Sequence, residues 1–178
     1  RRVGDLLLSL IARSLSLEDD WFASFFQSSS CNLRMLKYPP QLATAEFNQL
    51  GAGAHSDWGA LTLLAQDGVT GLQARHLNGT WLDVPHTDGA LAVNFGQVLE
   101  RWCGGRIKAT EHRVIGTGRE RMSIPFFYEA RADAEIAPLP LPGATSFEPF
   151  LYGDYLWATT TQFVEFKGME SLRKPMRH

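Results

Sequence analysis

Short extended runs separated by turn residues dominate the sequence from Leu33 to Tyr128, and this pattern limits the folds open to the chain. The runs are Leu33–Tyr38, Leu61–Leu64, Leu72–Arg75, Trp81–Val84, Ala90–Phe95, Ile107–Val114 and Met122–Tyr128. Pro39-Pro40 ends the first run, and Asn78-Gly79 predicts a type I′ hairpin between the third and fourth runs. Many short strands with turns at this spacing are typical of an antiparallel sandwich or barrel.

Helical patterns flank this β region on both sides. Apolar residues at i, i+3 and i+4 spacing predict helix over residues 5–26, with Ser16 capping a second short helix rich in aromatic side chains. Further along we expect a helical turn at Leu99–Trp102, a proline-rich loop over residues 138–149, a closing helix at Tyr155–Phe166 and a fraying tail at Lys167–His178. The chain thus divides into an N-terminal helical segment (1–30), a β core (31–130) and a C-terminal loop, helix and tail (131–178).

Composition argues against several classes of protein. The 178 residues carry 17 basic and 19 acidic side chains, so a net charge of −2 gives no electrostatic basis for binding nucleic acid. The apolar run Leu6–Ala12 is too short to span a bilayer. Cys31 and Cys103 fit no metal-ligand spacing, and we expect two buried free thiols in a reducing, cytoplasmic setting. We expect a monomer without a membrane or nucleic-acid partner.

A histidine and a carboxylate stand two residues apart in Gly53–Gly59, as His55 and Asp57. On an extended strand, residues i and i+2 point to the same face, so both side chains can reach one metal ion. His76 and His86 lie beside turns and His178 is terminal, which leaves His112 as the candidate third ligand. Two histidines and one carboxylate suit non-haem iron(II). The alternative is structural: His55 in a turn, Asp57 as a cap and His112 as a hydrogen-bonded core residue.

The run Arg121–Phe127 weighs against the structural alternative. By alternation Arg121 and Ser123 share one face, and Met122 and Ile124 share the other. If Met122 and Ile124 pack outward under a covering layer, the Arg121 guanidinium points inward, where an unpaired charge is costly. A small carboxylate held by Arg121 and the Ser123 hydroxyl would satisfy it. The alternative is an exposed arginine on an edge strand.

The combined motifs resemble the iron(II) and 2-oxoglutarate-dependent oxygenases, in the branch that includes isopenicillin N synthase. The resemblance rests on His55-x-Asp57, His112 and Arg121-x-Ser123, and extends to Leu33–Pro40, Asp57–Leu64, Gly71-Leu72-Gln73, Trp81, Asn94-Phe95-Gly96 and His112-Arg113-Val114. It implies a mainly β fold, a double-stranded β-helix (a cupin-like jelly roll) with flanking helices. It also implies oxidative decarboxylation of 2-oxoglutarate with O₂, coupled to hydroxylation, desaturation or cyclisation of a small-molecule substrate.

The resemblance also implies roles for single residues. His55, Asp57 and His112 would bind Fe(II), and Arg121, Ser123 and Tyr38 would hold the distal carboxylate of 2-oxoglutarate. A second set of positions departs from the family pattern. Leu36 stands where many 2-oxoglutarate users have asparagine, and Gln97 replaces the acid of the common Asn-x-Gly-Asp pattern.

These departures keep two further functions open. Isopenicillin N synthase uses the same arginine and serine on its peptide substrate, so an oxoacid-independent Fe(II) oxidase is one alternative. Family members also have an additional N-terminal region that helps to wall the substrate pocket, and we expect that region to be missing here. A truncated, non-catalytic metal-binding form is therefore the other alternative.

Overall fold

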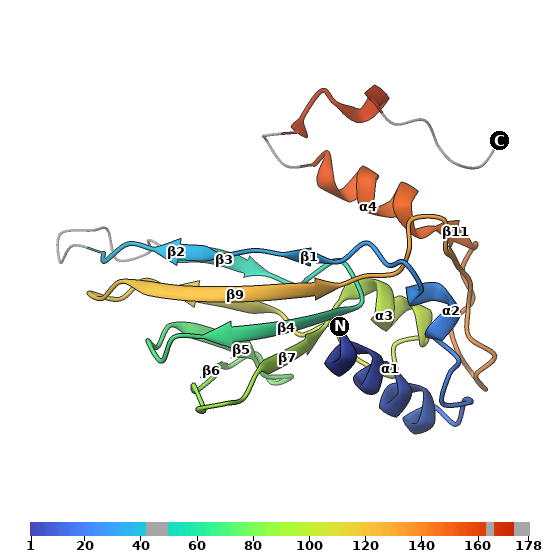
Figure 1. Cartoon of the computed structure of the whole chain (residues 1–178), viewed down its shortest axis with the longest axis horizontal. Helices are drawn as coiled ribbons and strands as arrows, with labels where there is room; N and C mark the ends of the chain where they lie inside the picture. The colour runs from blue at the N-terminus through green and yellow to red at the C-terminus, as the bar shows by residue number, and fades with distance from the viewer. Residues whose placement is uncertain (42–49, 163–165, 173–178) are drawn as a thin grey trace.

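The computed structural model, which describes residues 1–41, 50–162 and 166–172, has two large antiparallel sheets and a third sheet of only two strands (Figure 1). The first sheet contains β1 (Asn32–Leu33), β2 (Leu36–Tyr38), β4 (Leu61–Gln66), β7 (Ala92–Phe95) and β9 (Arg121–Tyr128). Its strand order is β1-β9-β4-β7, and β2 also pairs with β9, next to the segment that pairs with β1. The second sheet has the order β3-β8-β5-β6, from β3 (Leu50–His55), β5 (Leu72–Arg75), β6 (Trp81–Asp83) and β8 (His112–Ile115). The predicted mainly β, antiparallel architecture is confirmed.

Strand β9 shows the alternation expected from its sequence. Arg121 and Ser123 are only 2% and 3% exposed, whereas Met122 and Ile124 are 41% and 36% exposed. The Arg121 side chain therefore points inward, as predicted. A layer covering Met122 and Ile124 is not seen among the described residues.

Helices gather at one end of the sheets, as Figure 1 shows for α1 (Arg2–Ser14), α2 (Ala23–Phe26) and α3 (Gln97–Trp102). Phe22 and Phe25 meet Trp102 edge-on, with ring centroids 5.2 and 4.8 Å apart. These contacts join the N-terminal segment to the core. After β10 (Glu135–Ile136) and β11 (Phe150–Leu151) the chain forms α4 (Tyr152–Thr160) and the 3₁₀ helix η2 (Glu170–Leu172). None of the described helices is long and apolar enough to cross a membrane.

Two predicted strands differ most from their sequence pattern. The run Leu33–Tyr38 is split into β1 and β2 because the gap lies opposite Pro125, which has no N–H to donate to the ladder. In the run Ile107–Val114 only the end belongs to β8. The amide of Ile107 donates instead to Cys103 Sγ (3.3 Å) and that of Ala109 to Glu100 Oε2 (2.7 Å).

The helical boundaries also differ from the predictions. Ser16 has a positive φ of 60° and caps nothing; α2 begins only at Ala23. The closing helix α4 ends at Thr160 rather than Phe166, within a run of three threonines. The hydroxyls of Thr159, Thr160 and Thr161 donate to carbonyls four residues back, and β-branched residues of this kind weaken a helix end. Residues 163–165 and 173–178, including His178, lie outside the described residues.

The hairpin between β5 and β6 is confirmed, but its turn is not type I′. Only Gly79 in the turn has a positive φ (91°), and its amide donates to His76 O (2.8 Å). Asn78 Oδ1 accepts from the Thr80 amide (3.0 Å), so the asparagine side chain closes the turn in place of a second positive φ. The cysteines are both free, yet only Cys103 is buried; Cys31 is exposed beside β1, and the prediction of two buried thiols is wrong.

Candidate metal centre

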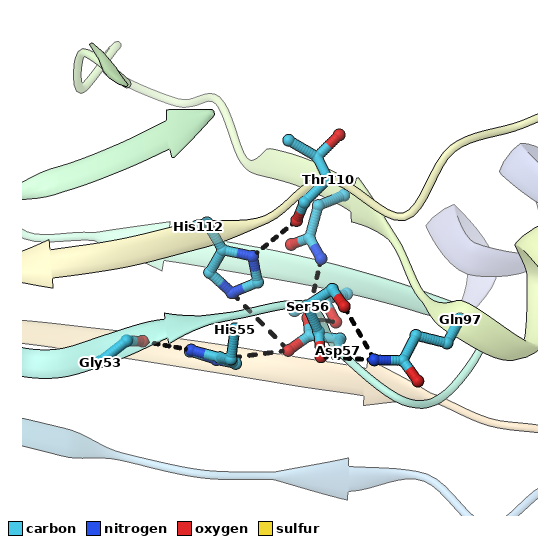
Figure 2. A network of polar contacts seen from close by, with 9 residues as sticks. Gly53, His55, Ser56, Asp57, Gln97, Thr110 and His112 are labelled. Carbon is cyan, nitrogen blue, oxygen red and sulfur yellow. Dashed lines mark hydrogen bonds and ion pairs between the residues drawn. The ribbon is translucent and has the colours of Figure 1, made fainter. Parts of the chain in front are cut away.

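The three predicted metal ligands lie together, with one possible ligand atom of each within 4.8 Å of the others (Figure 2). His55 is the last residue of β3, His112 is the first of β8, and the two are paired in register with ring centroids 4.4 Å apart. Asp57 lies two residues beyond the end of β3, so it reaches the site from a loop rather than from the strand assumed for it. Its Oδ1 is 3.8 Å from His55 Nε2 and 3.7 Å from His112 Nε2.

Backbone carbonyls orient both histidine rings. His55 Nδ1 lies 2.7 Å from Gly53 O, and His112 Nδ1 lies 3.0 Å from Thr110 O (Figure 2). Because a carbonyl only accepts hydrogen bonds, each Nδ1 carries a proton, and the lone pair available to a metal on the neutral ring is therefore that of Nε2. Both lone pairs face Asp57 Oδ1, which is the ligand arrangement that a divalent ion requires.

The second carboxylate oxygen of Asp57 is held by two donors that sequence reasoning did not single out. Thr62 Oγ1 donates to Asp57 Oδ2 at 2.5 Å, and Asn94 Nδ2 donates to the same atom at 2.7 Å. Thr62 comes from β4 and Asn94 from β7, neighbours in the first sheet. The signal was a polar residue within each of two otherwise apolar strands, although nothing in the sequence says what they bind.

Arg121 lies in the same cavity as these ligands. The cavity measures about 390 Å³ and is lined by the three ligands, Arg121, Ser123 and Tyr38, together with apolar side chains. The guanidinium donates through Nη2 to Gln66 Oε1 (3.2 Å) and lies 5.1 Å from the Tyr38 ring centroid. Its Nε and Nη1 are buried without a hydrogen-bond partner among the described residues. A buried cation with two unpaired donors is a receptor for an anion.

The remaining candidate histidines lie away from this cavity. His76 and His86 are exposed beside turns, as predicted, and His86 Nε2 contacts Asp88 (2.9 Å). The structure therefore brings together the ligand set chosen from the sequence and leaves the other described histidines outside it.

A buried carboxylate, Glu129, supports the loop that follows Asp57. It accepts a hydrogen bond from the Tyr152 hydroxyl (2.5 Å) and one from the Ala60 amide (3.1 Å). Burial raises the pKa of Glu129 to about 7, the two hydrogen bonds oppose the rise, and the Asp57 charge adds to it. Tyr155 also donates to Trp58 O (3.2 Å), so α4 is tied to the ligand loop at two points.

Comparisons with known proteins agree with this geometry. The family model of the 2OG-Fe(II) oxygenase superfamily matches residues 29–130. The 2-oxoglutarate-Fe(II) type oxidoreductase hxnY of Emericella nidulans is 41% identical over 138 residues, which are 75% of this chain and 39% of that protein. The 2-oxoglutarate-dependent dioxygenase traH of Penicillium crustosum is 36% identical over 154 residues, 85% of this chain and 46% of that protein.

A solved structure resembles the fold over nearly the whole chain. A full-length Neurospora crassa protein, solved in complex with alpha-KG and 5-formyluracil, superimposes with a TM-score of 0.85 at 28% identity, covering 91% of this chain and 56% of that one. The chain spans less than half of the length of the two curated relatives. The family match covers the β core and both candidate subsites of the cavity. The chain belongs to the 2OG-Fe(II) oxygenase superfamily.

Proposed function

We propose that this chain is the catalytic core of an Fe(II) oxygenase that couples oxidative decarboxylation of 2-oxoglutarate to oxidation of a small organic substrate. The observation that carries the proposal is one cavity holding both a two-histidine, one-carboxylate cluster and the buried, incompletely bonded Arg121. Each half alone has ordinary explanations. Together they match the two cofactor requirements of the family.

The donor set fits iron(II). Two neutral imidazole nitrogens and one carboxylate oxygen on one side of an ion leave its other side open. One ligand atom of each residue lies within 4.8 Å of the others, with Nε2–Oδ1 separations of 3.8 and 3.7 Å, so small side-chain movements would bring all three onto one ion. His55, Asp57 and His112 would hold the metal, and their rings and carboxylate are already fixed by Gly53, Thr110, Thr62 and Asn94.

The anion receptor fits the distal carboxylate of 2-oxoglutarate. Nε and Nη1 of Arg121 are free to donate, and a guanidinium binds a carboxylate through two parallel hydrogen bonds. Ser123 lies on the same face of β9, two residues away, and is 3% exposed. Tyr38 is paired in register with Arg121 and places its ring over the guanidinium. These three side chains would orient the oxoacid.

The chain supplies position and exclusion of water; bound iron and 2-oxoglutarate would together activate O₂ for attack on a C–H bond. The buried Arg121 fixes which end of the oxoacid faces the metal. The apolar wall, which includes Leu64, Val84 and Phe127, would exclude water from one side of the reacting centre. Hydroxylation, desaturation and cyclisation all remain within this chemistry, as does a small-molecule substrate.

The proposal extends to architecture. We infer that the two sheets form a double-stranded β-helix, with residues 31–130 as its core, residues 1–30 as a flanking helical segment and residues 131–178 as a C-terminal loop, helix and tail. The support is the pairing of β3 with β8 and of β4 with β9, which brings the candidate ligands and Arg121 to one cavity.

A second candidate, the oxoacid-independent Fe(II) oxidase, is favoured by Leu36. This side chain lines the cavity opposite Ser123, where an amide would have given the oxoacid another hydrogen bond. Succinate formed per O₂ consumed separates the two functions. The oxygenase forms succinate, and the oxidase consumes O₂ without it.

The direct test is to add Fe(II) and then 2-oxoglutarate to the protein without oxygen. We expect a visible metal-to-ligand charge-transfer band, because the oxoacid would chelate the iron while Arg121 holds its far end. The band should be weakened by replacing Arg121 and kept in Arg119→Gln, the matched control, because Arg119 is exposed and two residues from Arg121. A folded, iron-loaded protein that shows no band at saturating 2-oxoglutarate would contradict the proposal.

A further inference from the structure

A second arginine lines the cavity at a distance from Arg121. Arg34 lies between β1 and β2, where its amide donates to Pro125 O (3.0 Å) and its guanidinium lies 5.7 Å from the Phe127 ring centroid. Its neighbour on β2, Lys37, is exposed and pairs with Glu120 at 3.0 Å. None of the ion pairs among the described residues involves Arg34.

Arg34 belongs to the metal end of the cavity. Phe127, over which its guanidinium lies, is paired in register with Thr62, and Thr62 donates to Asp57. Arg121 lies six residues away from Phe127 on the same strand, which is about 20 Å along an extended chain. The distal carboxylate of an oxoacid held at Arg121 would lie toward the other end of this span, and its near end would be bound by the metal. The two arginines therefore address two different ligands.

Arg34 is exposed and makes no ion pair with the described acidic residues around the cavity. Among the described residues, Asp57 is the only acidic side chain that lines the cavity. Asp57 would bind the metal, and Asp67, which does not line the cavity, lies close enough to Arg121 for the two charges to attract each other. No carboxylate among the described cavity-lining residues is therefore left to pair with Arg34.

The cavity that Arg34 lines has apolar walls as well as the metal ligands. Leu64, Ala92, Val93, Pro125 and Phe127 are among its lining residues. A ligand that complements it has an apolar body against these side chains and one anionic group at the guanidinium. We propose that Arg34 binds the carboxylate of the primary substrate, which is an apolar carboxylic acid. This inference rests on the proposed function, because it needs Arg121 to be occupied by the oxoacid.

The experiment uses matched pairs of probes with the protein loaded with Fe(II) and 2-oxoglutarate in the absence of oxygen. The probes are 3-phenylpropionate, trans-cinnamate and octanoate, each against its neutral primary amide. Binding is followed by calorimetry and by the perturbation of the charge-transfer band. The band must persist during the titration, which shows that a probe acid has not displaced the oxoacid.

We expect at least one acid to bind about tenfold more tightly than its amide, as for one charge-assisted contact. Arg34→Gln should remove that preference, Arg34→Lys should restore part of it, and the control Lys37→Gln should keep it. None of these variants should change 2-oxoglutarate affinity. Equal binding of acids and amides, a preference that survives Arg34→Gln, or no acid binding at about 5 mM would overturn the inference. A missing band before any probe is added would instead refute the proposed function.

Discussion

Thr62 Oγ1 and Asp57 Oδ2 are 2.5 Å apart, and this hydrogen bond gives the two carboxylate oxygens different roles: Oδ2 accepts hydrogen bonds and Oδ1 is left to bind a metal. Asn94 Nδ2 donates to the same Oδ2 at 2.7 Å. Oδ1 alone therefore faces the two imidazole Nε2 atoms. With Oδ2 engaged, Asp57 would coordinate through one oxygen, which leaves three positions on a six-coordinate ion for the oxoacid and O₂.

Replacing Thr62 by valine tests this division. The valine keeps the volume but leaves Oδ2 with one donor, so the carboxylate is free to rotate or to chelate the metal. We expect Fe(II) affinity to fall about 10- to 100-fold, as for other partners of metal-binding side chains. Anaerobic Fe(II) titration measures it. Thr161→Val is the control, because this threonine is also buried (6% exposed) but donates only to backbone carbonyls of α4. Equal affinities in both variants would contradict the role of Thr62.

Asp57→Ala should abolish measurable iron binding and leave the fold largely intact. The two histidines remain, but the negative ligand that favours a divalent ion is lost. Thr62 and Asn94 lose their acceptor, which costs about 1–3 kcal/mol of folding free energy. Metal content after dialysis and thermal unfolding of the apo protein check both statements. His86→Ala, at an exposed histidine bonded to Asp88, should change neither. Full iron affinity in Asp57→Ala would disprove the ligand assignment.

Arg121→Met should separate ligand binding from stability. Nε and Nη1 of Arg121 are buried without partners among the described residues, so the unliganded protein gains little from this charge. We expect the thermal midpoint of the apo protein to stay the same or rise, while 2-oxoglutarate affinity falls by about 100-fold. Calorimetry with 2-oxoglutarate and a melting curve without it give the two values. A large loss of apo stability would show that Arg121 is a structural residue.

Local patterns were sufficient to predict the parts of the fold that depend on alternation. In β9 the period of two placed Arg121 and Ser123 inside and Met122 and Ile124 outside, as the structure shows. Elimination among the histidines selected His112, which lies beside His55 and Asp57. Both successes follow from rules that act within one strand or exclude turns.

The features that could not be predicted depend on contacts between distant segments. Pro125 of β9 interrupts the pairing of β9 with β1 and β2, and Glu100 on α3 accepts a hydrogen bond from the amide of Ala109. Asp57 lies beyond its strand, where a loop supported by Glu129 places it. The donors Thr62 and Asn94 meet Asp57 only because β4 and β7 are paired. No local pattern carries such information.

Gly4→Ala should destabilise the protein although alanine favours helices. A Cβ at Gly4 would overlap the ring of Tyr128, which is fully buried and bonded through its hydroxyl to Asp5. Overpacking of this kind costs about 1–3 kcal/mol, more than the gain of about 1 kcal/mol in helix propensity. Urea unfolding measures the net effect. Gly118→Ala, where a Cβ would meet nothing within 4 Å, should change stability by less than about 0.5 kcal/mol. A stabilised Gly4→Ala would mean that α1 does not rest on Tyr128.

Glu129 should make the stability of the protein depend on pH near neutrality. Burial raises the pKa of Glu129 from 4.5 to about 7, although the hydrogen bonds from Tyr152 and the Ala60 amide oppose the rise. Between these two pH values the folded state therefore keeps a proton that the unfolded chain releases. The contribution is fully present below pH 4.5 and is lost as pH rises through about 7. At 1.36 kcal/mol per pKa unit, the loss is about 3 kcal/mol.

Glu129→Gln isolates this contribution, because a glutamine oxygen can accept both hydrogen bonds but does not ionise. Between about pH 5 and pH 8 the wild type should lose more unfolding free energy than the variant, by about 2–3 kcal/mol. Urea unfolding of the apo protein at the two pH values gives the difference. Glu148→Gln, at an exposed position, should follow the wild type. If the wild type and Glu129→Gln instead showed parallel pH profiles, Glu129 would already be ionised in the folded state, and the loop between Asp57 and Ala60 would rest on a buried carboxylate charge.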